Sequence, residues 1–127
     1  MRAQAVNDER TTLTPPEIFR LLADETRLRA LVLLHAEGEL CVCELTIALE
    51  VSQPKMSRHL ALMRDAGLVA DRRERVWIHY RIAPAIAKWI GTILDAACTS
   101  VVSFAPYRED RRRLAVMPDR PSQRCRN

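Results

Sequence analysis

The chain has 127 residues, of which 48% are hydrophobic, which is enough for one domain with its own core. Twenty Lys and Arg against 16 Asp and Glu leave a net charge of +4, an excess too small to establish a nucleic-acid partner by itself. The N-terminus lacks the apolar run of a signal peptide, and the longest nearly continuous apolar run, residues 28–34, is too short to span a bilayer. We therefore expect a cytoplasmic protein whose four cysteines are free thiols or metal ligands, not structural disulfides.

Three helices are predicted in the N-terminal half, after a flexible segment over residues 1–14. Pro15 and Pro16 suit the first turn of a helix, where no backbone N–H donor is required. Asp24 is a candidate N-cap of the second helix, and Gly38 follows that helix as a natural stop. A third, short helix carries apolar side chains at Leu45, Ala48 and Leu49.

A fourth helix is predicted to open with polar residues directly after a tight turn. Ser52 is a favoured N-cap, Pro54 falls in the first turn, and Gly67 ends the helix. Two short helices joined by a tight turn, the second with a polar start, indicate a helix-turn-helix. The buried stripe of the fourth helix is formed by Met56, Leu60 and Met63.

Residues 68–82 are predicted to form a β-hairpin with its turn near residues 72–75. The second strand shows the period-two pattern, in which Val76, Ile78, Tyr80 and Ile82 alternate with Trp77, His79 and Arg81. A hairpin that follows a helix-turn-helix forms a wing.

The C-terminal part is predicted to contain one last helix and a tail. The helix starts at Pro84 and reaches Cys98, with a dense apolar stripe that packs on the rest of the monomer or on a second copy. Residues 101–127 are rich in Arg and Pro, and we expect them to be a mobile or loosely docked tail. The stripe comprises Ile86, Trp89, Ile90, Ile93, Leu94 and Ala97.

Two cysteines, Cys41 and Cys43, stand about ten residues ahead of the polar start of the fourth helix. Soft thiolates select soft, thiophilic ions. On a regular helix, residues spaced i, i+2 point about 200° apart. The two thiols therefore meet at one ion only if this segment is non-helical or is distorted by binding. A nearby helix N-terminus is expected to lower the thiol pKa values.

With these segments together, the chain resembles the ArsR/SmtB family of metal-sensing repressors, and in particular its arsenic-responsive branch. The resemblance covers residues 15–100 and is carried by ELCVCEL at 39–45, SQPKMSRHLALMR at 52–64 and GLV at 67–69, with support from 23–27 and 77–81. It implies a mainly α winged helix-turn-helix with a small β-hairpin, a homodimer in which residues 15–100 form the DNA-binding and dimerisation domain. It also implies a repressor that binds operator DNA when ion-free and dissociates on binding arsenite or antimonite, with no organic cofactor.

The resemblance implies that Cys41 and Cys43 bind the ion, but it leaves a third ligand open. Some relatives carry a third Cys three residues after the second, where this chain has Thr46, a poor ligand for a soft ion. Cys98 and Cys125 are the candidates, from the same chain or a partner, and a free thiol is a third possibility. Alternative inducers are cadmium or lead, and oxidation of the two thiols is an alternative signal. A zinc site on the last helix is not expected, because that helix has Asp95 but no His.

The predicted DNA-binding residues lie at the start of the fourth helix and in the hairpin. We assign base contacts to Gln53, Ser57 and Arg58, and phosphate contacts to Ser52 and Lys55. A two-fold dimer would place two such helices about 34 Å apart, one turn of DNA, with the first and last helices as the interface. His59 is predicted either to reach DNA or to pack, and Arg72, Arg73 and Arg75 to meet phosphates or the minor groove.

Two other classes of protein compete with a repressor. A thiol oxidoreductase is disfavoured because no Cys-x-x-Cys motif and no βαβ pattern surround the cysteine pair. An interaction module would dimerise without binding an ion. No phosphate loop and no Ser-His-Asp pattern are found, so we do not expect an enzyme.

Overall fold

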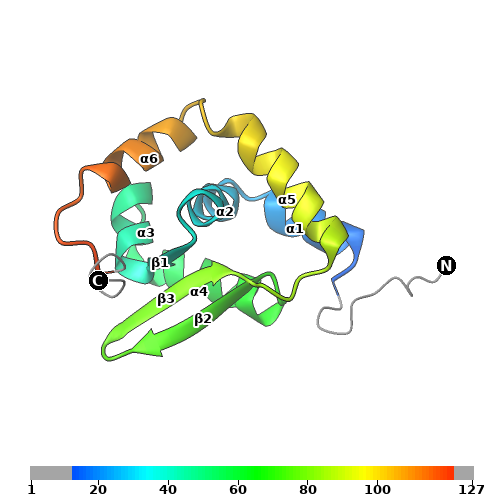
Figure 1. Cartoon of the computed structure of the whole chain (residues 1–127), viewed down its shortest axis with the longest axis horizontal. Coiled ribbons are helices and arrows are strands. Elements are labelled where there is room, and N and C mark those ends of the chain that lie inside the picture. Colours follow the sequence, from blue (N-terminus) through cyan, green and yellow to red (C-terminus); the bar gives the residue numbers. More distant parts are fainter. Residues whose placement is uncertain (1–12, 122–127) are drawn as a thin grey trace.

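The computed structural model describes residues 13–121, which fold into six helices and one three-stranded sheet. Helix α2 lies in the middle of the other helices, and the sheet extends away from them (Figure 1). No helix of the described residues is long and apolar enough to cross a membrane. The elements are α1 (Pro15–Leu22), α2 (Glu25–Glu37), β1 (Glu39–Cys41), α3 (Val42–Leu49), α4 (Gln53–Asp65), β2 (Val69–Glu74), β3 (Trp77–Ile82), α5 (Lys88–Val101) and α6 (Tyr107–Ala115).

The start of α2, its end and the start of α4 are set by local sequence signals, as predicted. The Asp24 side chain accepts a hydrogen bond from the backbone N–H of Arg27 at 3.0 Å and caps α2. The Ser52 hydroxyl accepts from the N–H of Lys55 at 3.3 Å and caps α4. Gly38 ends α2 with a φ of 92°, a conformation that a residue without a Cβ adopts at low cost.

The core is built around α2, whose residues from Ala30 to Leu34 are all buried. A helix that is buried over a continuous run must be covered on several sides, and α1, α3, α4, α5, α6 and the sheet all contact α2. The predicted stripe of α4 is confirmed, because Met56, Leu60 and Met63 are fully buried. The polar start of α4 is therefore held on a closely packed base.

The sheet has the strand order β1-β3-β2, so the hairpin gains a third strand that was not predicted. Strand β1 has three residues, too few to show an alternating pattern in the sequence. The predicted position of the turn is also wrong: residues 72–74 belong to β2, and Arg75 and Val76 connect the strands. Arg75 takes a φ of 59° there, as a two-residue hairpin turn requires of its first residue.

The C-terminal part differs most from the prediction. Helix α5 begins at Lys88, not at Pro84, and it is not the last helix. A further helix, α6, packs on α3 and buries Asp110 and Leu114. The expectation of a mobile or loosely docked tail is thus wrong for residues 107–121, because α6 and Arg120 make buried contacts with the domain.

Helices α3 and α4 form a helix-turn-helix, and strands β2 and β3 form the wing that follows it (Figure 1). The predicted winged helix-turn-helix, mainly α with a small β element, is confirmed. Two features of the fold lie at opposite ends of α3: the strand–helix junction at Cys41 and, after the turn at residues 50–52, the exposed start of α4.

Candidate functional site

The two neighbouring cysteines occupy different backbone conformations. Cys41 is the last residue of β1 and the N-cap of α3, with extended backbone angles of −83° and 163°, whereas Cys43 lies in the first turn of the helix. The Cys43 side chain is near enough to the Cys41 thiol to act on its pKa. Of the two conditions predicted to bring the thiols together, a non-helical segment or distortion by binding, the structure shows the first, because Cys41 has an extended backbone.

The thiol of Cys41 is buried, and its acidity is opposite to the prediction. Burial raises the pKa of Cys41, and the hydrogen bond with Cys43 and the charge of Glu44 act in the same direction. The N–H of Glu44 at the helix start lowers this pKa, but its effect is smaller than that of burial. The expected lowering of the thiol pKa by the helix N-terminus is thus wrong for Cys41, because loss of water outweighs the helix end. Cys43 is partly exposed, which gives solvent a route to the pair.

Glu44 connects the thiol turn, the β1–α3 junction that carries Cys41 and Cys43, to the C-terminal end of the described chain. Its side chain is completely buried, and its Oε1 accepts the backbone N–H of Cys41 at 2.8 Å. Its Oε2 accepts a charge-assisted hydrogen bond from the Arg120 Nε, also at 2.8 Å. The Nη2 of Arg120 lies 3.4 Å from a carboxylate oxygen of Glu37 at the end of α2. The first turn of α3 is therefore tied to a residue 76 positions later in the chain.

The other end of α3 is held by a second buried ion cluster. The Asp110 carboxylate accepts hydrogen bonds from Arg29 and Arg113, each at 2.7 Å. The same two arginines donate to the last carbonyls of α3: Arg113 to Ala48 at 2.6 Å and Arg29 to Leu49 at 2.9 Å. These carbonyls have no partner within the helix, so the arginines cap it. Residues from α2 and α6 thus fix the end of α3 that leads into the turn before α4.

Of the two predicted third ligands, Cys98 does not lie beside the thiol pair. Cys98 is buried on α5, and α2 lies between α5 and α3 (Figure 1). Burial raises the pKa of the Cys98 thiol to about 11, so it is a protonated core side chain at neutral pH. Cys125 lies outside the described residues. Within residues 13–121, no three His, Cys, Asp or Glu side chains are grouped closely enough to hold a metal ion.

The predicted DNA-binding residues of α4 lie together at its start. Ser52, Gln53, Lys55 and Arg58 are exposed, and Ser57 is half-buried. The first backbone N–H groups of α4 point the same way and suit an anion such as phosphate. The arrangement exposes the side chains of Gln53, Lys55 and Arg58 to solvent, as a helix that reads a groove requires.

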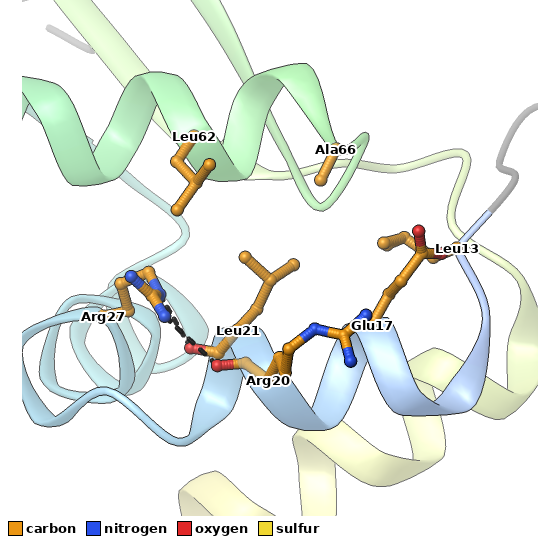
Figure 2. Close-up of a pocket in the computed structure, with 7 residues that line it drawn as sticks. All are labelled: Leu13, Glu17, Arg20, Leu21, Arg27, Leu62 and Ala66. Carbon is orange, nitrogen blue, oxygen red and sulfur yellow. Dashed lines mark hydrogen bonds between the residues drawn. The ribbon is translucent and has the colours of Figure 1, made fainter.

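His59 has a different environment from its neighbours on α4. Its Nδ1 lies 3.3 Å from the Nη1 of Arg27, and burial lowers the pKa of its imidazole. The rest of the Arg27 guanidinium is fixed by the carbonyls of Leu21 and Arg20, at 2.9 and 3.1 Å (Figure 2). Of the two predicted roles of His59, these contacts favour packing at the start of α2.

A pocket of about 320 Å³ lies between α1 and α4, away from the cysteines. Figure 2 shows Leu62 of α4 and Ala66, the residue that follows α4, facing α1 across it. Its remaining lining consists of Leu13, Glu17, Arg20, Leu21 and Arg27. The thiol pair is therefore a local feature of one chain turn and does not lie in this cavity.

The three wing arginines are not equivalent. Arg72 is bound by two carboxylates, with its Nη2 2.7 Å from Glu39 and its Nη1 2.6 Å from Glu74. Its hydrogen bonds also lower the pKa of the Glu39 carboxyl. Arg73 and Arg75 are exposed near the tip of the wing. Arg72 thus braces β2 against β1, whereas the other two are available to a partner.

Sequence reasoning missed Glu44, His79 and Arg120. Glu44 stands three residues after Cys41, the spacing of a capping box, so its bond to the N-cap could have been predicted. His79 is completely buried and lies opposite Cys41 in the strand register. Nothing in the sequence signals that Arg120 reaches Glu44, because the two residues meet only in the folded chain.

Comparison with known proteins places this geometry among bacterial regulators. Residues 24–71 match the family described as "Bacterial regulatory protein, arsR family". The chain is 48% identical over 112 residues, 88% of this chain and 86% of the relative, to the Arsenic resistance transcriptional regulator ArsR1 of Pseudomonas putida. It is similar to the crystal structure of the AntR antimony-specific transcriptional repressor, with 26% identity, a TM-score of 0.57 and coverage of 81% of this chain and 96% of that one.

A second solved structure is also similar to this chain. It is the homodimeric winged helix-turn-helix DNA-binding domain, fragment 1–100, of a possible ArsR-family transcriptional regulator from Mycobacterium bovis. The identity is 27%, the TM-score is 0.56, and the match covers 71% of this chain and 80% of that one.

Proposed function

Because this chain belongs to the arsR family of bacterial regulatory proteins, we propose that it is a transcriptional repressor released from its operator by arsenite or antimonite. The observation that carries the proposal is the position of Cys41 and Cys43 beside each other at the N-terminus of the first helix of the helix-turn-helix, with Cys41 in a non-helical conformation. The relatives' roles in arsenic resistance and antimony-specific repression support the class of inducer.

DNA recognition is assigned to the exposed start of α4 and to the tip of the wing. Gln53, Ser57 and Arg58 would contact base edges, while Ser52 and Lys55 contact phosphate. Arg73 and Arg75 would contact the backbone or the minor groove beside the site.

We propose that the working form is a homodimer, as in the Mycobacterium bovis domain. Phe19 of α1 is 56% exposed, and Trp89 and Ile93 of α5 are only partly buried, which leaves apolar surface on the two helices expected to pair. A two-fold pair would set the two α4 helices one DNA turn apart, about 34 Å, and double the number of contacts.

The protonation state of the site favours arsenite over divalent ions. Arsenite is an uncharged trihydroxide in neutral water, so each As–S bond that forms breaks one As–O bond, and the thiol proton leaves with the hydroxide as water. A divalent ion such as cadmium must instead displace the thiol protons into solution. Because the pKa of Cys41 is raised, this displacement is costly at neutral pH, whereas the exchange with arsenite releases no net proton.

For the third donor we propose Cys125 in preference to Cys98. Cys98 would have to leave a buried position on α5, across α2 from the thiol pair. Cys125 follows Arg120 by five residues, and Arg120 contacts Glu44 beside the pair. Five extended residues span at most about 17 Å, so the chain length permits Cys125 to reach the ion. Comparing arsenite affinity in Cys125→Ser and Cys98→Ser variants tests this assignment: only the first should bind more weakly.

Release of DNA follows from the position of the pair. Drawing the two thiols and a third donor onto one ion would rearrange the first turn of α3, and α3 leads through a short turn into α4. A shift of α4 misplaces its exposed donors relative to the base edges. By thermodynamic linkage, DNA must weaken arsenite binding by the same factor by which arsenite weakens DNA binding.

The test is fluorescence anisotropy of the reduced protein on the DNA upstream of its own gene, titrated separately with arsenite, antimonite, cadmium, lead and hydrogen peroxide. Release at low ratios of arsenite or antimonite to protein, with the other agents weaker, is the expected result. Release by cadmium or lead alone would assign the protein to divalent-ion sensing. Release by peroxide alone would indicate a redox switch, and tight binding untouched by any agent would refute regulation at the thiol pair.

A further inference from the structure

We propose that Arg120 is a positioning residue of the thiol site and that its ion pair with Glu44 holds the site in the ion-free arrangement. This inference rests on the proposed function and adds to it a part of the chain, α6 and the segment after it, that the matched family region at residues 24–71 does not include. The contact is made by residues 5% and 0% exposed, so it is a built interior contact and not a surface pair.

The two carboxylate oxygens of Glu44 bind different partners. Oε1 fixes the backbone N–H of Cys41, which keeps that residue in the extended N-cap conformation. Oε2 receives the Arg120 Nε at the same distance, 2.8 Å. A rotation of Glu44 that follows a movement of Cys41 must therefore lengthen the contact with Arg120. The Glu44 side chain therefore couples the conformation of Cys41 to Arg120 in the C-terminal segment.

Burial makes this coupling strong. A carboxylate without water is stable only if it is paired and hydrogen-bonded, and breaking one partner of such a pair is far more costly than breaking a surface pair. Arg120 supplies the countercharge at Glu44, and Glu37 provides a second carboxylate for the same guanidinium. The α6 helix keeps the segment in place, because Arg113 donates to the Ala48 carbonyl at the other end of α3 and Asp110 binds Arg29 of α2.

The direction of the effect follows. If binding of an ion moves Cys41 out of its present N-cap geometry, the Arg120–Glu44 pair opposes binding and favours the form that reads DNA. Replacing Arg120 should then tighten arsenite binding and weaken the ion-free protein's hold on its operator, as linkage demands. A merely structural pair would lower the stability of the fold and leave the arsenite affinity of the folded protein unchanged.

The experiment compares the full chain with its Arg120→Ala, Arg120→Lys and Arg111→Ala variants. Arg111 is exposed on α6 and serves as the matched control for loss of one positive charge. Arsenite affinity without DNA is measured from the ultraviolet absorbance of the arsenic–thiolate bonds, and fold integrity from circular dichroism. We expect roughly tenfold tighter arsenite binding in Arg120→Ala, a partial effect in Arg120→Lys and none in Arg111→Ala.

A second readout separates failure of this inference from failure of the proposed function. The rate at which iodoacetamide alkylates Cys41 reports opening of the junction and needs no arsenite. Faster alkylation of Cys41 in Arg120→Ala, with Cys98 unchanged, supports the positioning role even if the natural inducer is not arsenite. Alkylation and arsenite affinity both equal to those of the unaltered protein would overturn it. If Arg120→Ala does not fold, the same two measurements on Arg120→Lys decide the question.

Discussion

The two polar regions on either side of α3 differ in where their polar side chains lie: one set is buried and the other is exposed. At the thiol turn, Cys41 and Glu44 are buried, and the polar atoms of Glu44 are bonded within the chain. At the start of α4, Gln53, Lys55 and Arg58 are exposed to solvent. The eight residues of α3 join them, fixed at both ends by side chains from α2 or the C-terminal segment.

This difference matches the two functions proposed for one short stretch of chain, ion binding at the cysteines and DNA binding at the start of α4. A region that must change state on binding an ion is best built from internal contacts, since these give two distinct packed arrangements. A region that must bind DNA is best left without internal partners, so that its donors remain available. The predictions below separate the two regions experimentally.

The largest effect is expected at the thiol turn. In a Cys41→Ser, Cys43→Ser double variant, arsenite should no longer release DNA, because serine oxygens are poor ligands for a soft ion. The exposed start of α4 is untouched, so DNA affinity should remain within about twofold of the unaltered protein. Anisotropy titrations with and without arsenite measure both quantities, and Cys98→Ser is the control that should respond normally. Loss of DNA binding in the double variant would mean that the two regions are not separable.

The next effect concerns the anchor of α3. Asp110→Ala removes the buried carboxylate that pairs with Arg29 and Arg113 and should lower the free energy of unfolding by about 3–5 kcal/mol. Urea denaturation followed by circular dichroism measures this change. Asp65→Ala removes an exposed carboxylate and should have a much smaller effect. Equal effects of the two substitutions would contradict the anchoring role of α6.

At the reading end, Arg58→Ala should weaken operator binding by roughly tenfold, about 1.4 kcal/mol, which lies within the range of about 1–3 kcal/mol for a base-edge contact. Arsenite affinity in the absence of DNA should not change, because Arg58 is exposed and separated from the thiols by α3. The measurement compares two binding curves of the Arg58→Ala variant, one with operator DNA and one with arsenite. A shift in arsenite affinity would show that the reading face feeds back on the thiol site without DNA.

The smallest effect is expected in the wing. Arg72→Ala should weaken DNA binding less than Arg73→Ala does, because Arg72 is already held by Glu39 and Glu74. We expect less than roughly twofold for Arg72 and several-fold for Arg73, with a shallower salt dependence in the latter. Anisotropy at several salt concentrations distinguishes them. The reverse order would indicate that Arg72 exchanges its internal partners for phosphate when DNA binds.

Local signals in the sequence were sufficient for much of the fold. Asp24, Ser52 and Gly38 act where capping rules place them, since a cap depends only on residues within one turn. The stripe Met56, Leu60 and Met63 is buried as its spacing predicts. The predictions failed where the signal was short or distant: β1 has only three residues, and the hairpin turn moved to Arg75, a non-glycine residue in a left-handed conformation.

The sequence by itself determined the winged helix-turn-helix and placed Cys41 and Cys43 just ahead of the reading helix. Periodicity and capping are local properties, and the resemblance rests on contiguous motifs. Only the tertiary structure decided that the two cysteines lie beside each other at a strand–helix junction, that burial outweighs the helix N-terminus at Cys41, and that Arg120 reaches Glu44. Those three facts depend on desolvation and on contacts between residues far apart in the chain, which no local pattern encodes.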